Sequence, residues 1–118
     1  MPDKAQITNN KIPINDFQKL NLKVGKILDV KDHPNADKLY ILEVDLAEEK
    51  QRQIIAGLKP YYTKNVLKGK KAIFIANLEP AILRGVKSDG MILAADNEKG
   101  KVIFIIPEKD IEEGSKIR

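Results

Sequence analysis

The chain has 118 residues, of which 42% are hydrophobic, so it can form one domain with a single modest core and is too short for two. It contains no cysteine, which excludes a disulfide scaffold and cysteine-based zinc or thiol chemistry. Residues 1–11 are polar, and no stretch approaches the roughly 18 apolar residues of a membrane span. We therefore expect a flexible tail over residues 1–11, one domain over residues 12–118, and a soluble cytoplasmic protein without a membrane partner.

The net charge of +4 is unevenly distributed along the chain. Residues 50–78 contain no Asp or Glu, and their lysines and arginine contribute +7 to that total. Such clustering is typical of a surface that binds nucleic acid, although a lysine-rich solvated face gives the same composition.

The N-terminal part of the domain predicts a short helical turn followed by a strand. Asn15 and Asp16 can cap a turn over residues 17–20. Residues 22–31 then alternate, with Leu22, Val24, Leu28 and Val30 expected on one face. Gly25 within this strand predicts a bulge or a sharp bend.

The remaining elements are short strands separated by turn signals. After a turn at residues 33–37 we expect strands at 38–46, 51–57 and 71–77, with a helical or looped plug at 58–70. Residues 90–95 and 101–106 form a predicted hairpin, and residues 107–118 a short helix and an extended end. This pattern indicates an all-β, five-stranded Greek-key barrel, with an SH3-like barrel or a small sandwich as alternatives.

The stretch from Leu83 to Met91 has an unusual composition for a turn. It places Arg, Lys, Ser and Asp around two glycines and leads directly into an apolar strand. A loop that only reverses the chain does not need this mixture, so we expect it to present polar groups to a phosphate-rich partner at the edge of the barrel.

Several motifs together resemble one known family. HPNADKL at residues 33–39 and RGVKSDGM at 84–91, with LNLKVGKILDV, RQIIAGLKPYY and the closing GSKIR, are similar in order and spacing to the tRNA-binding domain family. That family includes freestanding tRNA-binding proteins, the C-terminal domain or β subunit of methionyl-tRNA synthetase, and the CsaA export chaperone. The resemblance covers residues 14–118. It implies an OB-fold barrel with short helices and extra N- and C-terminal segments, which recognises the folded shape of tRNA without catalysis.

The resemblance and the chemistry of the side chains select six candidate contacts to tRNA. Basic side chains suit phosphates, an amide and a hydroxyl suit riboses or bases, and a thioether can pack on an exposed base. The alternatives are a paired surface lysine, a turn-forming Asn and a Met in the core. The six residues are Lys38, Arg52, Asn77, Arg84, Ser88 and Met91.

The segment before Arg84 departs from the pattern of the family. Many relatives carry a basic cluster there, whereas this chain has Glu79, Ala81 and Ile82. We therefore expect the turn to supply shape and hydrogen bonds, and a secondary basic patch to supply much of the charge. That patch consists of Lys64, Lys68, Lys70 and Lys71.

The terminal segments and the missing catalytic groups complete the expectations. Phe17, Leu20, Ile111 and Ile117 are apolar residues outside the five-stranded core, which suits a homodimer interface, although they could instead cap the barrel ends.

The single histidine, His33, precedes a proline in a turn, so we predict no enzyme activity, cofactor or metal. The expected partners are tRNA, a second copy and the catalytic subunit of a methionyl-tRNA synthetase. The rival hypothesis is a CsaA-like chaperone or a protein-interaction module.

Overall fold

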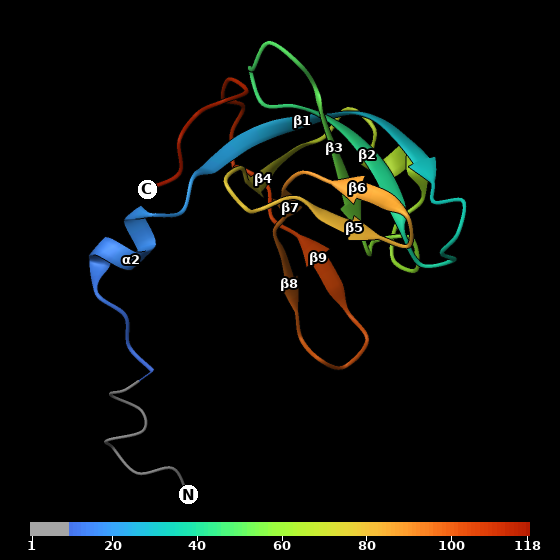
Figure 1. Ribbon diagram of the computed structural model, residues 1–118, viewed down its shortest axis with the longest axis horizontal. Coiled ribbons are helices and arrows are strands. Elements are labelled where there is room, and N and C mark those ends of the chain that lie inside the picture. The colour runs from blue at the N-terminus through green and yellow to red at the C-terminus, as the bar shows by residue number, and fades with distance from the viewer. Residues whose placement is uncertain (1–9) are drawn as a thin grey trace, which may run out of the picture.

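The computed structural model describes residues 10–118, so most of the predicted tail, residues 1–9, lies outside the described residues. The described chain is built from short strands with two short helices (Figure 1). In order they are α2 (Ile14–Gln18), β1 (Leu22–Asp32), β2 (Tyr40–Asp45), β3 (Arg52–Ala56), α3 (Lys64–Leu67), β4 (Lys71–Ile75), β5 (Ala81–Leu83), β6 (Val86–Ser88), β7 (Met91–Ile92), β8 (Ala94–Asp96) and β9 (Val102–Phe104).

Five strands form one antiparallel sheet in the order β3-β2-β1-β4-β7. The long strand β1 serves two neighbours, because its first half pairs with β4 from Leu22 to Lys26 and its second half pairs with β2 from Lys26 to Asp32. The sheet therefore curls into a nearly closed barrel, and the predicted all-β class with short helices is confirmed. None of the helices within residues 10–118 is both long and apolar enough to cross a membrane.

Alternating apolar positions of the strands fill the barrel. Phe74, Ile27, Leu42 and Ile54 are fully buried, and Leu67 of α3 is buried in the same core cluster. Gly25 is needed for close packing, because a Cβ there would lie 2.7 Å from Leu46 Cδ2. Burial of these side chains is the main contribution to the stability of the barrel.

The predicted alternation in β1 is wrong beyond its middle. A register shift between Ile27 and Asp29 marks a bulge, which inserts Leu28 as the extra residue. Consequently Ile27 is fully buried and Leu28 only half-buried, the reverse of the prediction. The bulge lies after Gly25 and not at that residue.

The two chain ends also differ from the prediction. Helix α2 begins at Ile14 after Pro13, so Asn15 and Asp16 lie inside the helix and do not cap it. Residues 107–118 form no helix. Instead the Gly114 and Ile117 amides donate to the carbonyls of Val24 and Leu22, at 2.7 and 2.9 Å. The reason is that β2 pairs with β1 only from Lys26 onward. The residues of β1 before Lys26 are therefore available to the C-terminal segment on that edge.

The region after β4 contains two hairpins where one was predicted. Strands β5 and β6 pair across the stretch that the sequence indicated only as a turn. The strand predicted over residues 90–95 is split, because only β7 joins the barrel while β8 pairs with β9 in a separate hairpin. Figure 1 shows this second hairpin extending away from the barrel.

Candidate nucleic-acid interface

A pocket of about 460 Å³ lies across the outer side of β1, β2 and β3. Its charges are mixed, with two basic and two acidic side chains, so it does not attract phosphate by net charge alone. The side chains lining it include Asp29 and Lys31 from β1, Ile41 and Glu43 from β2, and Arg52 and Gln53 from β3.

Two irregular segments meet beside this pocket. The first is the β1–β2 loop, residues 33–39, which carries the HPNADKL motif. The second is the β5–β6 hairpin, which lies beside β3 because Gln53 Nε2 donates to the Lys87 carbonyl and the Asp89 amide donates to the Gln53 carbonyl, both at 2.8 Å. In Figure 1 the hairpin lies beside β3 in this way. The pocket is thus flanked by the two segments whose motifs the sequence singled out.

The tip of the hairpin holds Arg84 in an uncommon backbone conformation. Leu83 pairs with Val86, and the two residues between them, Arg84 and Gly85, have φ values of +53° and +85°. Positive φ at both positions is the requirement of a type I′ turn, in which Asn-Gly is the favoured pair. An arginine in this position is strained, and the strain is a reason to look for a use of its side chain.

Lys38 and Arg84 are exposed cations on these two flanking segments. Among residues 10–118, neither side chain lies within ion-pair distance of an acidic group. Met91, at the start of β7, is 49% exposed. These three predicted site residues are therefore accessible to a ligand.

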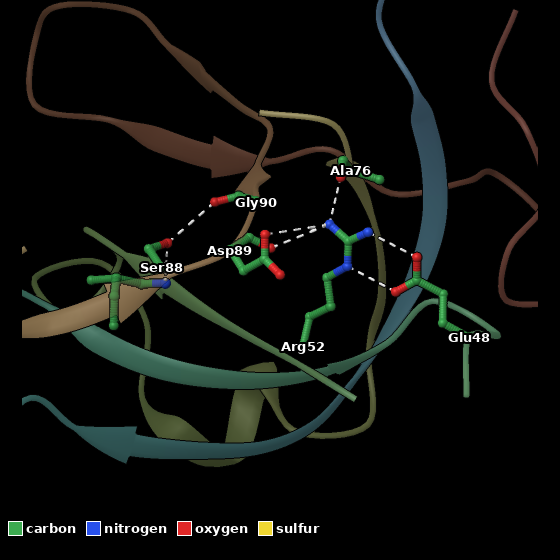
Figure 2. Close-up of polar contacts among 7 residues, drawn as sticks. Glu48, Arg52, Ala76, Ser88, Asp89 and Gly90 are labelled. Carbon is green, nitrogen blue, oxygen red and sulfur yellow. Dashed lines mark hydrogen bonds and ion pairs between the residues drawn. The ribbon is translucent and has the colours of Figure 1, made fainter. Parts of the chain in front are cut away.

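Arg52 is engaged within the protein (Figure 2). Its Nε and Nη2 atoms donate to the two carboxylate oxygens of Glu48, both at 2.8 Å, and Nη1 donates to the Ala76 carbonyl. The Asp89 carboxylate lies 3.8 Å from Nη1. The hydrogen bond with Arg52 lowers the pKa of Glu48, and the same bond raises the pKa of Arg52. The guanidinium thus joins the turn after β2 to the residue that follows β4 and to the connection between β6 and β7.

Ser88 and Asn77 also bond to the chain itself. Ser88 is 5% exposed, and its hydroxyl accepts the Ile55 N–H at 2.9 Å and donates to the Gly90 carbonyl at 3.2 Å. The Asn77 side chain accepts the Asn21 N–H at 2.7 Å and donates to the Lys19 carbonyl at 2.6 Å. In the described structure Ser88 therefore closes the barrel and Asn77 ties the segment after α2 to the end of β4.

The fold supplies acidic partners to the basic run. Lys64 and Lys59 lie 2.8 and 3.1 Å from the two oxygens of Asp32, whose pKa they lower mainly through these hydrogen bonds, that of Lys64 first. Other acidic groups reach the secondary basic patch, with Lys68 at 3.9 Å from Asp29 and Lys71 at 2.7 Å from Asp110. Of the patch, only Lys70 has no ion pair among the described residues.

Sequence reasoning missed residues of two kinds. Lys31 and Gln53 line the pocket, and their place on the outer side of β1 and β3 could have been found from the strand alternation. His33 and Asn35 bond to the hairpin tip, and no sequence signal connects them to residues about 50 positions away. Within residues 10–118, no group of three or more His, Cys, Asp or Glu side chains is placed to hold a metal ion.

The four residues predicted for a dimer interface lie in the terminal segments. Leu20 and Ile111 are 38% and 42% exposed, and Phe17 and Ile117 are half-buried. Helix α2 buries none of its side chains, and in Figure 1 it stands apart from the barrel. Among residues 10–118, no α2 side chain is fully buried, and Phe17 is the most covered of them.

Comparison with known proteins identifies the relatives of this chain. The family model described as "Putative tRNA binding domain" matches residues 22–116. The methionine-tRNA ligase of Thermococcus onnurineus is 52% identical over 107 residues, which are 91% of this chain and 14% of that enzyme. The methionine-tRNA ligase of Nanoarchaeum equitans is 50% identical over 116 residues, 98% of this chain and 15% of the enzyme. The chain thus spans about one seventh of the length of these relatives.

Solved structures agree with the fold. The MetRS related protein from Pyrococcus horikoshii matches with a TM-score of 0.85 and 31% identity, over 92% of this chain and 99% of that one. The chaperone CsaA from Bacillus anthracis matches with a TM-score of 0.82 and 26% identity, over 92% and 99%. The predicted OB-like barrel is confirmed, and the methionine-tRNA ligases are the more similar relatives in sequence.

Proposed function

Because the chain belongs to the tRNA-binding domain family, we propose that it is a non-catalytic module that binds tRNA by its folded shape. One observation carries the proposal: the pocket across β1, β2 and β3 is flanked by the β1–β2 loop and the β5–β6 hairpin, which present Lys38 and Arg84. OB folds bind oligonucleotides across this face, between the loop joining strands 1 and 2 and the loop joining strands 4 and 5.

In the proposed complex, different groups serve different parts of the RNA. Arg84 can donate two parallel hydrogen bonds to one phosphate, and Lys38 supplies a second cation from the neighbouring loop. The Gln53 amide oxygen, whose Nε2 atom is already bonded to the Lys87 carbonyl, and the strand side chains of the pocket can pair with 2′-hydroxyls or splayed bases, and Met91 offers an apolar contact. The mixed charge of the pocket favours recognition of shape over non-specific attraction to any polyanion.

Arg52, Asn77 and Ser88 remain part of the proposed site, but mainly as residues that shape it. Each of these side chains already bonds within the protein, so we assign them first to shaping the site and second to touching the ligand. Similarly, Lys64, Lys68 and Lys71 have carboxylate partners, so this patch contributes less to binding than Lys38 and Arg84.

We further propose that the module serves a methionyl-tRNA synthetase, as one of its domains or as a separate subunit in the cytoplasm. The support is a sequence identity of about 50% between this chain and segments of methionine-tRNA ligases. A tethered module of this kind raises the local concentration of tRNA at the catalytic part without adding a contact to the reaction centre.

A homodimer is also proposed, with α2 and the C-terminal segment at its interface. Leu20 and Ile111 are exposed, and so are Ile12 and Ile14 at the start of α2, at 65% and 67%. A second copy of the same apolar segment would cover these exposed side chains, since no α2 side chain is fully buried within residues 10–118. Light scattering should give twice the chain mass, and Ile14→Asp should reduce it; a constant monomer mass would contradict the dimer.

The function is tested by measuring affinity for folded tRNA, an unstructured RNA of equal length and an unfolded polypeptide. We expect preference for folded tRNA, a loss of affinity in Lys38→Ala and Arg84→Ala, and no change in Lys99→Ala, which removes an exposed lysine from the distant β8–β9 turn. Equal affinity for both RNAs would contradict shape recognition. Binding of the unfolded polypeptide alone would support the chaperone hypothesis.

A further inference from the structure

His33 is a buried side chain in the β1–β2 loop, with 5% of its surface exposed. Its Nδ1 atom accepts the backbone N–H of Asn35 at 3.0 Å. The ring proton is therefore on Nε2, which donates to the Leu83 carbonyl at 2.8 Å. One histidine thus orders its own loop and reaches the β5–β6 hairpin.

Asn35 makes a second bond to the same hairpin. Its Nδ2 atom donates to the Arg84 carbonyl at 3.0 Å, and a Cβ on Gly85 would lie 3.8 Å from that atom. Two consecutive carbonyls of the hairpin, those of Leu83 and Arg84, are therefore held by two side chains of one loop.

These bonds act on the backbone of Leu83 and Arg84, and within residues 10–118 the Arg84 side chain has no ion pair. The guanidinium is exposed, and the Arg84 φ of +53° is a conformation that needs support from its surroundings. The two side-chain bonds supply that support. A turn built only for stability would carry Asn or Gly in this position.

We propose that His33 and Asn35 are positioning residues, which hold the hairpin tip so that the Arg84 guanidinium faces the RNA backbone. This inference rests on the proposed tRNA-binding function. It also explains why the two motifs that mark the sequence, HPNADKL and RGVKSDGM, occur together: each contributes one side of a single contact.

A positioning role differs from a general structural role in what a double-mutant cycle measures. If Asn35 acts through Arg84, its replacement matters for RNA affinity only when Arg84 is present. If Asn35 merely stabilises the fold, its replacement lowers the melting temperature and changes affinity equally in both backgrounds. Asn35 is exposed, so Asn35→Ala is a safer variant than a change of buried His33.

The experiment compares affinities for folded tRNA of the wild type, Asn35→Ala, Arg84→Ala and the double variant. We expect Asn35→Ala to weaken binding about fivefold, as for loss of one hydrogen bond, and the double variant to bind like Arg84→Ala. The matched control is Asn97→Ala, which removes a side chain that accepts the Lys99 and Lys101 amides in the β8–β9 turn and should bind like wild type.

Several results would overturn the inference without affecting the proposed function. These are wild-type affinity in Asn35→Ala or strictly additive losses in the double variant. An Arg84→Ala variant that binds folded tRNA normally would contradict both the inference and the contact that the proposed function assigns to Arg84. A wild-type protein that does not prefer folded tRNA would instead overturn the proposed function itself, and the positioning role with it.

Discussion

The Ser88 hydroxyl lies 2.9 Å from the Ile55 amide nitrogen and links β6 to β3, two strands that belong to different sheets. At this junction a side-chain hydrogen bond therefore joins the two strands, whereas backbone hydrogen bonds join neighbouring strands elsewhere in the barrel. Asp89 adds a second link, because its amide donates to the Gln53 carbonyl at 2.8 Å. The hairpin that carries Arg84 is anchored to the barrel through this seam.

Replacing Ser88 by Ala should destabilise the protein by roughly 1 to 3 kcal/mol, because the buried Ile55 N–H then has no acceptor. The measurement is chemical denaturation. Ser115→Ala is a suitable control, since its hydroxyl donates to the Glu112 carbonyl at an exposed site. A Ser88→Ala variant as stable as this control would show that the hydroxyl is not needed for closure.

Replacing Arg52 by Lys should cost about 1 to 3 kcal/mol of unfolding free energy. A lysine has no planar fork and cannot bond to both Glu48 oxygens and to the Ala76 carbonyl at once. Thermal and urea unfolding measure this loss. The predicted contact of Arg52 with tRNA is checked in Arg52→Gln, which removes the charge: an unchanged salt dependence of binding would argue against it.

Replacing Arg84 by Asn should separate stability from binding. Asn tolerates positive φ and is favoured in this turn, so the variant should gain about 1 kcal/mol of stability. It should also bind tRNA more weakly, with a salt slope smaller by about one unit. Tight binding by the stabilised variant would mean that the guanidinium does not touch the RNA.

Acid should loosen the C-terminal segment before the barrel unfolds. The hydrogen bond from Lys71 lowers the pKa of Asp110 below its usual 3.8, and that bond in turn raises the pKa of Lys71 above 10.5. Because the folded carboxyl has the lower pKa, its contribution to stability is complete above pH 3.8 and is lost as the pH falls through the folded value. The lysine contribution is complete below pH 10.5 and is lost as the pH rises through its raised pKa.

Hydrogen exchange reports this loosening directly. The Gly114 and Ile117 amides, which donate to Val24 and Leu22, should lose protection in acid earlier than the Leu93 amide, which donates to Ile73 in the barrel. Lys71→Met should show the same low protection already at neutral pH. Equal protection of all three amides down to acid unfolding would contradict a role for this ion pair.

Strands with simple alternation could be predicted from the sequence because one physical rule determines them. In the second predicted strand, Tyr40, Leu42, Val44 and Leu46 alternate with polar residues, and all four are buried. The rule fails at Leu28, because Gly25 indicates a bulge or bend but does not show that the register shifts between Ile27 and Asp29. The predicted pairing of residues 90–95 with 101–106 is confirmed for β8 and β9, but a period of two does not show that residues 91 and 92 leave this hairpin to pair with β4.

The site could be predicted only in part, for a related reason. The motifs located the β1–β2 loop and the hairpin, and residue chemistry selected Lys38 and Arg84. Local sequence could not show that Arg52 bonds to the Ala76 carbonyl, or that His33 reaches Leu83. Nor could a count of lysines foresee that Asp32 would lie beside Lys59 and Lys64. These contacts join distant positions and arise only in the folded chain.

The central claim is that tRNA binds across β1, β2 and β3 between the two flanking segments. Amide chemical shifts of the labelled protein during titration with folded tRNA test it most directly. We expect the largest changes at Lys31, Lys38, Gln53 and Arg84. Changes confined to α2 and the β8–β9 hairpin, with these four amides unmoved, would contradict it.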